Sequence, residues 1–243
     1  MAVRFGDGRH DGRDGRDRRH ERLADVIVER VRGSRPGEIP RRLCDVAVEL
    51  LPVTGASVSL RADGVPLRLT ETDARAAQLA ELQATLGDGP GQSAGSSGVP
   101  VLASDLTAGR DARRWPVFAQ EASELGVCAV YALPLGSGRI CVGTLDLYRD
   151  TVGELTPGEL GTAGCVARIV TVSLTDLSRT ARLGGLVADY DEIHQATGMI
   201  MVQLGVDAEE ALVRLRAHAY SHGRTVLAVA REVVGRRRRL DRG

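Results

Sequence analysis

Residues 191–242 read DEIHQATGMIMVQLGVDAEEALVRLRAHAYSHGRTVLAVAREVVGRRRRLDR, and this stretch decides how the chain is organised. Apolar residues recur in it at steps of three and four, which predicts three short amphipathic helices. Gly205 and Gly223 end the first two helices, as glycine does just past a last helical turn. Asp207, with a glutamate three residues further on, is the predicted N-cap of the second helix, and Thr225 is that of the third. Helices this short are stable only when they pack on one another, so the stretch predicts a three-helix module.

Each predicted helix carries an apolar stripe on one face. The residues of the three stripes are Ile193, Ala196, Ile200, Met201 and Leu204; Ala211, Leu212, Leu215 and Ala219; and Val226, Leu227, Ala230, Val233 and Val234. From residue 212 onward, arginines far outnumber the acids Glu232 and Asp241. A small helical module with arginine on its surface favours nucleic-acid binding over catalysis. The four arginines at 236–239 predict a flexible tail, which either adds phosphate contacts or is simply solvated.

Three motifs of this module resemble the ANTAR domain, an RNA-binding module of bacterial antitermination regulators. They are Ala196-Thr197-Gly198-Met199-Ile200-Met201, then Glu210-Ala211 followed by Leu215-Arg216 and Ala219, and finally Val229-Ala230 with Val233-Val234. The resemblance covers roughly the last quarter of the chain. It implies a protein that binds paired RNA stem-loops and so prevents a terminator hairpin from forming. Thr197 stands where many members have lysine, so affinity would depend more on arginine.

The candidate RNA-binding residues lie on all three predicted helices and on the turn before the last. They are Gln195, Thr197, Gly198, Arg214, Arg216, Arg224 and Arg231. A glycine inside a helix costs about 1 kcal/mol relative to alanine, so Gly198 indicates the close approach of either another helix or an RNA backbone. For each arginine alone, the alternative is a solvated charged face.

The composition excludes several classes of function. All 32 basic residues are arginine, which excludes a P-loop lysine, a Schiff-base lysine and the lysine of receiver domains. Aromatic residues make up only 3%, which disfavours base-stacking platforms. No run of eighteen apolar residues predicts a membrane span, and the first residues do not resemble an export signal, so we expect a cytoplasmic protein. The four cysteines have no metal-ligand or redox spacing, and we predict reduced thiols, no metal and no cofactor.

Residues 23–178 mix predicted helices and strands, which gives an α+β fold class for the whole chain. Residues 1–22, rich in Arg, Gly and Asp, are predicted to be a disordered tail. Residues 179–190 are predicted to be a helical linker, 191–235 the RNA-binding module and 236–243 a basic tail. Within the larger domain, the patterns predict a helix at 74–86 and a hairpin of strands at 127–135 and 140–148, followed by a long helix that Thr156 and Glu159 cap.

Several motifs of residues 23–178 are similar to those of the GAF domains that precede ANTAR modules. They are Leu86-Gly87-Asp88-Gly89-Pro90-Gly91, Ser104-Asp105-Leu106, Arg114-Trp115-Pro116, Glu124-Leu125-Gly126-Val127, Ala132-Leu133-Pro134-Leu135 and Val142-Gly143-Thr144-Leu145-Asp146-Leu147-Tyr148. The resemblance implies an antiparallel sheet, flanking helices and a cleft for a small molecule. We name Gly89 and Trp115 as candidate ligand contacts. The alternatives are a mobile loop at 87–98 and a tryptophan that belongs to the core.

A heptad spacing links the two predicted domains and suggests a homodimer. It runs through Leu183, Leu186, Tyr190, Ile193, Thr197, Ile200 and Leu204. A parallel dimer along this seam would present two RNA-binding modules to a target with two hairpins. The alternative is that the seam packs within one chain.

Two other functions remain open at this point. The last two helices have the spacing of a DNA-binding helix-turn-helix, although the second offers only Arg231 and Glu232 as base readers. The module could instead bind a protein partner. An enzyme is disfavoured because no histidine or carboxylate has the spacing of a catalytic group, and His218 with His222 lacks a third metal ligand.

Overall fold

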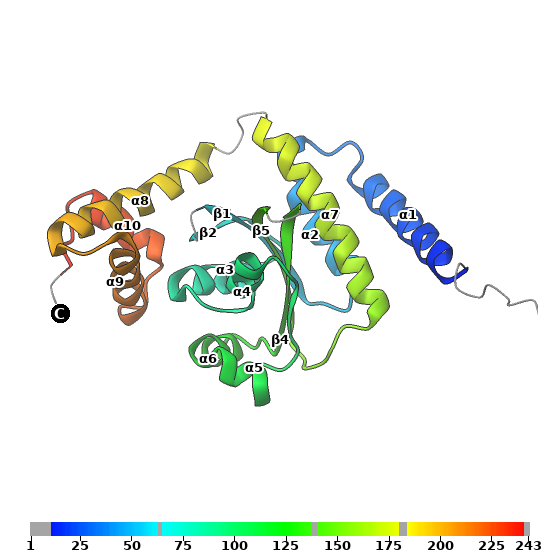
Figure 1. Cartoon of the computed structure of the whole chain (residues 1–243), viewed down its shortest axis with the longest axis horizontal. Coiled ribbons are helices and arrows are strands. Elements are labelled where there is room, and N and C mark those ends of the chain that lie inside the picture. Colours follow the sequence, from blue (N-terminus) through cyan, green and yellow to red (C-terminus); the bar gives the residue numbers. More distant parts are fainter. Residues whose placement is uncertain (1–10, 63–64, 138–139, 180–183, 241–243) are drawn as a thin grey trace, which may run out of the picture.

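The computed structural model describes residues 11–62, 65–137, 140–179 and 184–240, which form an α+β domain followed by a bundle of three helices (Figure 1). The strands are β1 (Gly55–Ala62), β2 (Val65–Glu71), β3 (Val101–Ala103), β4 (Ala129–Ser137) and β5 (Ile140–Arg149). The helices of the first domain are α1 (Asp11–Val31), η1 (Pro36–Glu38), α2 (Ile39–Leu50), α3 (Ala74–Leu86), α4 (Pro90–Ser97), α5 (Gly109–Arg114), α6 (Pro116–Glu124) and α7 (Pro157–Arg179). The last three are α8 (Gly184–Leu204), α9 (Ala208–Ser221) and α10 (Val226–Val234).

The five strands form one sheet in the order β2-β1-β5-β4-β3, and all neighbouring strands are antiparallel. The central strand β5 alternates between the two faces, as an extended chain must. Leu145 and Leu147 are buried in the core beneath α2 and α7. Thr144 and Asp146 line the opposite face, which α3 and α4 cover. This alternation places polar side chains under α3 and α4, where the fold leaves a cleft.

Helix α3 has the bounds that the sequence predicted. Asp73 caps its start by accepting hydrogen bonds from the backbone N–H groups of Arg75 and Ala76. Gly87 ends it in the left-handed region at φ 68°, a conformation that glycine adopts without strain. The position of this last turn matters because it meets both the cleft and the three-helix module.

Helix α1 corrects the prediction of a disordered tail at residues 1–22. It begins at Asp11, and only residues 1–10 lie outside the described part of that segment. Ile27 is fully buried, and Leu23, Ala24 and Val31 pack beside it on the core that α2 and α7 share. Once these residues anchor a helix, each further residue adds one backbone hydrogen bond, so the helix extends into the polar segment.

The glycine-rich stretch 87–98 is not the mobile loop that stood as the alternative to a ligand-contacting segment, since residues Pro90–Ser97 form α4. Pro90 at the first helical position fixes the backbone there, and Gly98 ends the helix at φ 69°. The two glycines inside α4 allow close approach to the sheet. A side chain on Gly91 or Gly95 would collide with Asp146 or with Arg61, respectively.

The second and third helices of the module begin at the caps that the sequence predicted, whereas α8 begins at Gly184, inside the predicted linker. Asp207 accepts a hydrogen bond from the Glu210 N–H at 2.8 Å, and Thr225 accepts one from the Ala228 N–H at 3.2 Å. The carboxylate of Glu210 binds Arg214 rather than completing a capping box. Leu240 is buried in the core of the module, and Gln203 donates a hydrogen bond to its carbonyl. The predicted flexible tail is therefore ordered as far as residue 240.

The module docks on one edge of the α+β domain. Val65 and Leu67 of β2 belong to the same buried core as Ile193, Leu215 and Val226 of the module. In Figure 1, α8–α10 lie beyond β1, β2 and α3, on the side of the sheet away from α1 and α7. Apolar side chains of both domains therefore stabilise this docked arrangement.

Candidate nucleic-acid interface and ligand cleft

An open groove runs along the outer face of α8. The side that belongs to α8 carries Gln195, Gly198, Met199, Val202 and Gln203, and Val233, Arg236, Arg238 and Arg239 line the other side. A Cβ added at Gly198 would meet no atom within 4 Å, so close packing against another helix does not account for this glycine. Val202 is 88% exposed beside it. The groove therefore has the exposed backbone of α8 at Gly198 on one side and Arg236, Arg238 and Arg239 on the other.

Thr197 does not belong to this groove. Its side chain is buried, and its hydroxyl donates to the Ile193 carbonyl at 2.8 Å. Ile193, Ile200 and Leu204 are buried in the core of the same module. The C-terminal part of the predicted dimer seam therefore packs within one chain. Leu183 lies outside the described residues, as do the side chains of Leu186 and Tyr190.

Two of the predicted RNA-binding arginines are paired with carboxylates. Arg214 binds Glu210 at 2.6 Å, one helical turn away. Arg231 binds both Asp189 at 2.7 Å and Glu192 at 2.6 Å. Such pairs cancel much of the local positive potential, and an RNA phosphate would have to compete with the carboxylates. Exposed pairs of this kind contribute little stability, at most about 1 kcal/mol each, so they are easily exchanged.

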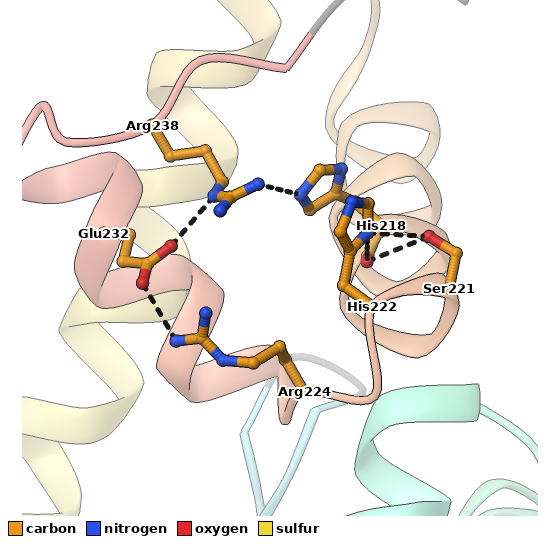
Figure 2. Close-up of polar contacts among 6 residues, drawn as sticks. All are labelled: His218, Ser221, His222, Arg224, Glu232 and Arg238. Carbon is orange, nitrogen blue, oxygen red and sulfur yellow. Dashed lines mark hydrogen bonds and ion pairs between the residues drawn. The ribbon is translucent and has the colours of Figure 1, made fainter.

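A third arginine, Arg224, belongs to a polar cluster on the surface of the module (Figure 2). Glu232 lies between Arg224 at 2.9 Å and Arg238 at 2.8 Å. Arg238 also donates to Nε2 of His218 at 2.9 Å, which requires that nitrogen to be unprotonated. Partial burial and the neighbouring His222 and Arg238 lower the pKa of His218, which favours the neutral ring. Nε2 of His218 and Nδ1 of His222 thus have hydrogen-bond partners, and no group of three metal ligands occurs in the described part of the chain.

Arg216 is the predicted RNA-binding residue whose position was least expected. Its side chain lies against α3 of the α+β domain, where its Nε donates to the Ala84 carbonyl at 3.2 Å. Its Nη2 is buried and has no hydrogen-bond partner among the described residues. Burial, together with the positive charge of Arg61, lowers the pKa of this guanidinium. Leaving a buried donor unpaired costs about 1–3 kcal/mol. A hydrogen-bond acceptor that reached Nη2 of Arg216 would therefore stabilise this side chain.

Arg236, Arg237 and Arg239 carry the remaining charge near the groove, since no ion pair involves them within residues 184–240. The sequence predicted for these arginines a flexible tail that either adds phosphate contacts or is simply solvated. Their position beside the groove depends on Leu240, because burial of its side chain in the core of the module holds residues 236–240 in place.

The α+β domain has a small cleft between the sheet and helices α3 and α4. It is lined by Ser59, Leu60, Arg61, Pro66, Ala80, Gln83, Gly91, Gln92, Gly95, Gly143, Thr144 and Asp146. Its volume of about 20 Å³ accommodates a single small polar group. Asp146 lies at its base, and Arg61, bonded to Ser96 at 3.1 Å, is part of its wall.

Asp146 is the group in this cleft with an unmet hydrogen bond. Its Oδ2 accepts from Nε2 of Gln83 at 2.7 Å, whereas Oδ1 has no hydrogen-bond partner of normal geometry among the described residues. Burial raises the pKa of this carboxyl to about 6, although Gln83 and the nearby Thr144 hydroxyl favour the ionised form. Gln83 also accepts from the Gly91 N–H at 2.6 Å, which holds its amide over the carboxyl. The unpaired oxygen would bind a ligand that donates a hydrogen bond.

The two predicted ligand contacts lie outside this cleft. Trp115 is only 2% exposed and belongs to the core beneath α5 and α6, where its indole N–H donates to Ser93 at 3.2 Å. Gly89 precedes α4 at φ 129°, and a side chain there would collide with Gln83. Gly89 therefore supports the position of Gln83. Asp146 and Gln83 could not be recognised as a pair from sequence, because they lie on a strand and a helix 63 residues apart and only the fold brings them together.

Comparison with known proteins agrees with this architecture. A family model for the GAF domain matches residues 36–174, and a model for the ANTAR domain matches residues 183–234. The structure of the GAF domain from a phosphoenolpyruvate-protein phosphotransferase of Coxiella burnetii has 13% identity and a TM-score of 0.51, with 66% of this chain and 95% of that chain covered. Free methionine-R-sulfoxide reductase from Neisseria meningitidis, in complex with its substrate, has 17% identity and a TM-score of 0.43, with 74% and 98% covered. No curated protein matches the chain.

The sheet, the helices on both faces and the matched residues define a GAF domain, and the chain belongs to the GAF-domain family. Its C-terminal module is an ANTAR domain, and this order of domains is a regulatory arrangement known from RNA-binding antitermination regulators. No helix in the described ranges is long and apolar enough to cross a membrane.

Proposed function

We propose that this chain is an RNA-binding transcription antitermination regulator, in which the GAF domain controls an ANTAR module that binds paired RNA stem-loops. The observation that carries this proposal is the open groove along α8. There Gly198 exposes helix backbone, Gln195 offers an amide, and Arg236 and Arg239 supply positive charge without a competing carboxylate. An RNA stem has phosphates and 2′-hydroxyl groups on its surface, and these are the groups that such a groove can bind.

The test is an electrophoretic shift of the whole protein against three nucleic acids: a two-hairpin RNA, a scrambled RNA of the same length and a duplex DNA. At about 0.15 M salt, non-specific phosphate binding is weakened. We expect selective binding of the two-hairpin RNA. Preference for duplex DNA would instead support a helix-turn-helix regulator, and binding to none of the three would refute the RNA-binding function.

Two groove variants sharpen this experiment. Arg236→Ala with Arg239→Ala should weaken RNA binding by about tenfold or more and reduce its salt dependence, because two phosphate contacts are lost. Gly198→Leu should also weaken binding, since the new side chain would fill open space above α8 without disturbing the fold. The matched control is Arg110→Ala with Arg113→Ala, which removes the same charge from the exposed surface of α5. An equal loss in this control would show that only net charge matters.

The proposal extends to the partners of the protein. The GAF cleft would take a small polar ligand, the protein would act in the cytoplasm as a regulator rather than an enzyme, and it would work as a homodimer that presents two modules to two hairpins. Because Ile193, Ile200 and Leu204 are buried within one chain, the dimer would need contacts other than the C-terminal part of the predicted seam. Sedimentation velocity with and without RNA tests this, and a monomer under both conditions would refute the dimer.

A further inference from the structure

The outward surface of α9 around Arg216 is covered by the last turn of α3. Arg216 reaches across to the Ala84 carbonyl, and its guanidinium lies directly over Gly87, where a Cβ would stand only 2.6 Å from Nη1. Its Nη2 finds no acceptor there among the described residues. A guanidinium is suited to bidentate recognition of an anion, and the backbone of α3 offers it a single carbonyl. The last turn of α3 therefore covers this surface but accepts a hydrogen bond from only one of the nitrogens of Arg216.

Two further hydrogen bonds hold the same surface closed. The backbone N–H of Val226, at the start of α10, donates to the hydroxyl of Thr85 at 3.3 Å. The Tyr220 hydroxyl at the end of α9 donates to Glu121 of α6 at 2.9 Å. Both bonds join the module to the sensor domain, and neither belongs to the internal packing of either domain. Each can be removed by a substitution that keeps the shape of the side chain.

The turn of α3 that covers Arg216 also carries the residue that spans the GAF cleft. Gln83 binds Asp146 and the Gly91 N–H inside the sensor domain, while the next two residues, Ala84 and Thr85, bind the module. The Gly87 N–H bonds back to the Gln83 carbonyl, so the turn moves as one unit. A ligand that donates to Asp146 would compete with Gln83 and act on this turn directly.

We propose that the Arg216 surface of α9 is a second RNA-binding surface, which the sensor domain covers through the last turn of α3 and uncovers when Gln83 leaves Asp146. This inference rests on the proposed RNA-binding function and adds its regulation. In the covered arrangement RNA reaches only the groove along α8. In the open arrangement Arg216 exchanges one backbone carbonyl for a phosphate group, and the affinity for RNA rises.

The experiment measures RNA affinity and amide hydrogen exchange of residues 208–221 in the full-length protein. Thr85→Val and Tyr220→Phe each remove one bond between the domains, and each should speed exchange in α9 and tighten RNA binding by about three- to tenfold. Gln83→Leu should act in the same direction from the cleft side. Thr162→Val, which removes a hydroxyl bond within α7, is the matched control and should change neither quantity.

The double variant Thr85→Val with Arg216→Ala tests whether Arg216 is the residue that gains the contact. It should exchange as fast as Thr85→Val but bind RNA no more tightly than the unsubstituted protein. Faster exchange in Thr85→Val and Tyr220→Phe without tighter binding would overturn the inference and leave the RNA-binding function intact. Absence of RNA binding in every variant would refute the function itself. Tighter binding in Thr85→Val but not in Gln83→Leu would break the link to the cleft.

Discussion

At the scale of the residue, the environment of each arginine decides its role, and that environment comes from elements far away in sequence. The seven candidates of the module were chosen by residue type and by resemblance. Gln195 and Gly198 lie in the open groove, whereas Thr197 is buried and Arg216 lies against α3. Partners such as Asp189 and Ala84 could not be assigned to arginines from sequence, because these pairings depend on how helices and domains pack.

Asp146 gives a prediction about pH. Its folded pKa of about 6 lies above the ordinary 3.8, so the folded protein binds this proton more tightly than the unfolded chain does. The contribution of Asp146 to stability therefore falls as pH rises from about 4 to about 6 and stays low above that range. Asp146→Asn should remove this dependence and stabilise the protein at pH 7.5 by up to about 3 kcal/mol. Urea unfolding at several pH values measures it.

The control for this prediction is Asp150→Asn, because Asp150 is exposed and directly follows the end of β5. It should leave the pH profile of the free energy of unfolding unchanged. If Asp146→Asn showed the same profile as the unsubstituted protein, the buried carboxyl would not be the titrating group.

At the scale of the element, helix ends were predicted well and polar or glycine-rich helices were not. Asp207, Thr225 and Gly87 stand at the helix boundaries where local rules put them, because a cap depends on residues only three or four positions apart. The first half of α1 and the whole of α4 were missed because residues 11–22 and 90–97 are polar or rich in glycine and lack an apolar stripe. Ile27 anchors the first helix on the distant α2 and α7, and contact with the sheet supports the second.

The cap of α10 gives the prediction at this scale. Thr225→Ala removes the hydroxyl that accepts from the Ala228 N–H, and should lower the free energy of unfolding by about 1 kcal/mol. The measurement is the urea midpoint followed by circular dichroism at 222 nm. Thr162→Ala, within α7, should change it by less than about 0.5 kcal/mol. Equal losses in both variants would mean that the Thr225 hydroxyl does not act as a cap.

At the scale of the whole molecule, the shared core of β2 and the ANTAR module predicts that the two domains unfold together. Trp115 is the single tryptophan and lies in the GAF core, so its fluorescence reports that domain alone. Circular dichroism reports the helices of both domains. We expect the two urea transitions to coincide, as they do for one cooperative unit. A dichroism transition that begins at lower urea would contradict this.

Leu67→Ala should separate the two transitions, because Leu67 belongs to the core that joins the domains, and losing a buried leucine side chain costs about 2–5 kcal/mol. Leu102→Ala, on β3 at the opposite edge of the sheet, is the control and should shift both transitions together.

The overall fold class and the order of the domains were predictable from sequence. Their docking was not, since no local pattern records which edge of the sheet the module covers.

The contact between the last turn of α3 and the ANTAR module should constrain how the sequences of the two domains evolve. Because Ala84 packs on the core that contains Val226, and Arg216 lies over Gly87, a substitution on one side alters the fit of the other. In aligned homologues with the same two domains, we expect these positions to covary, and we expect a larger residue at position 87 only where Arg216 has become a smaller one. Lineages that exchange one domain for a foreign copy would lose this match, and their modules would respond poorly to the signal.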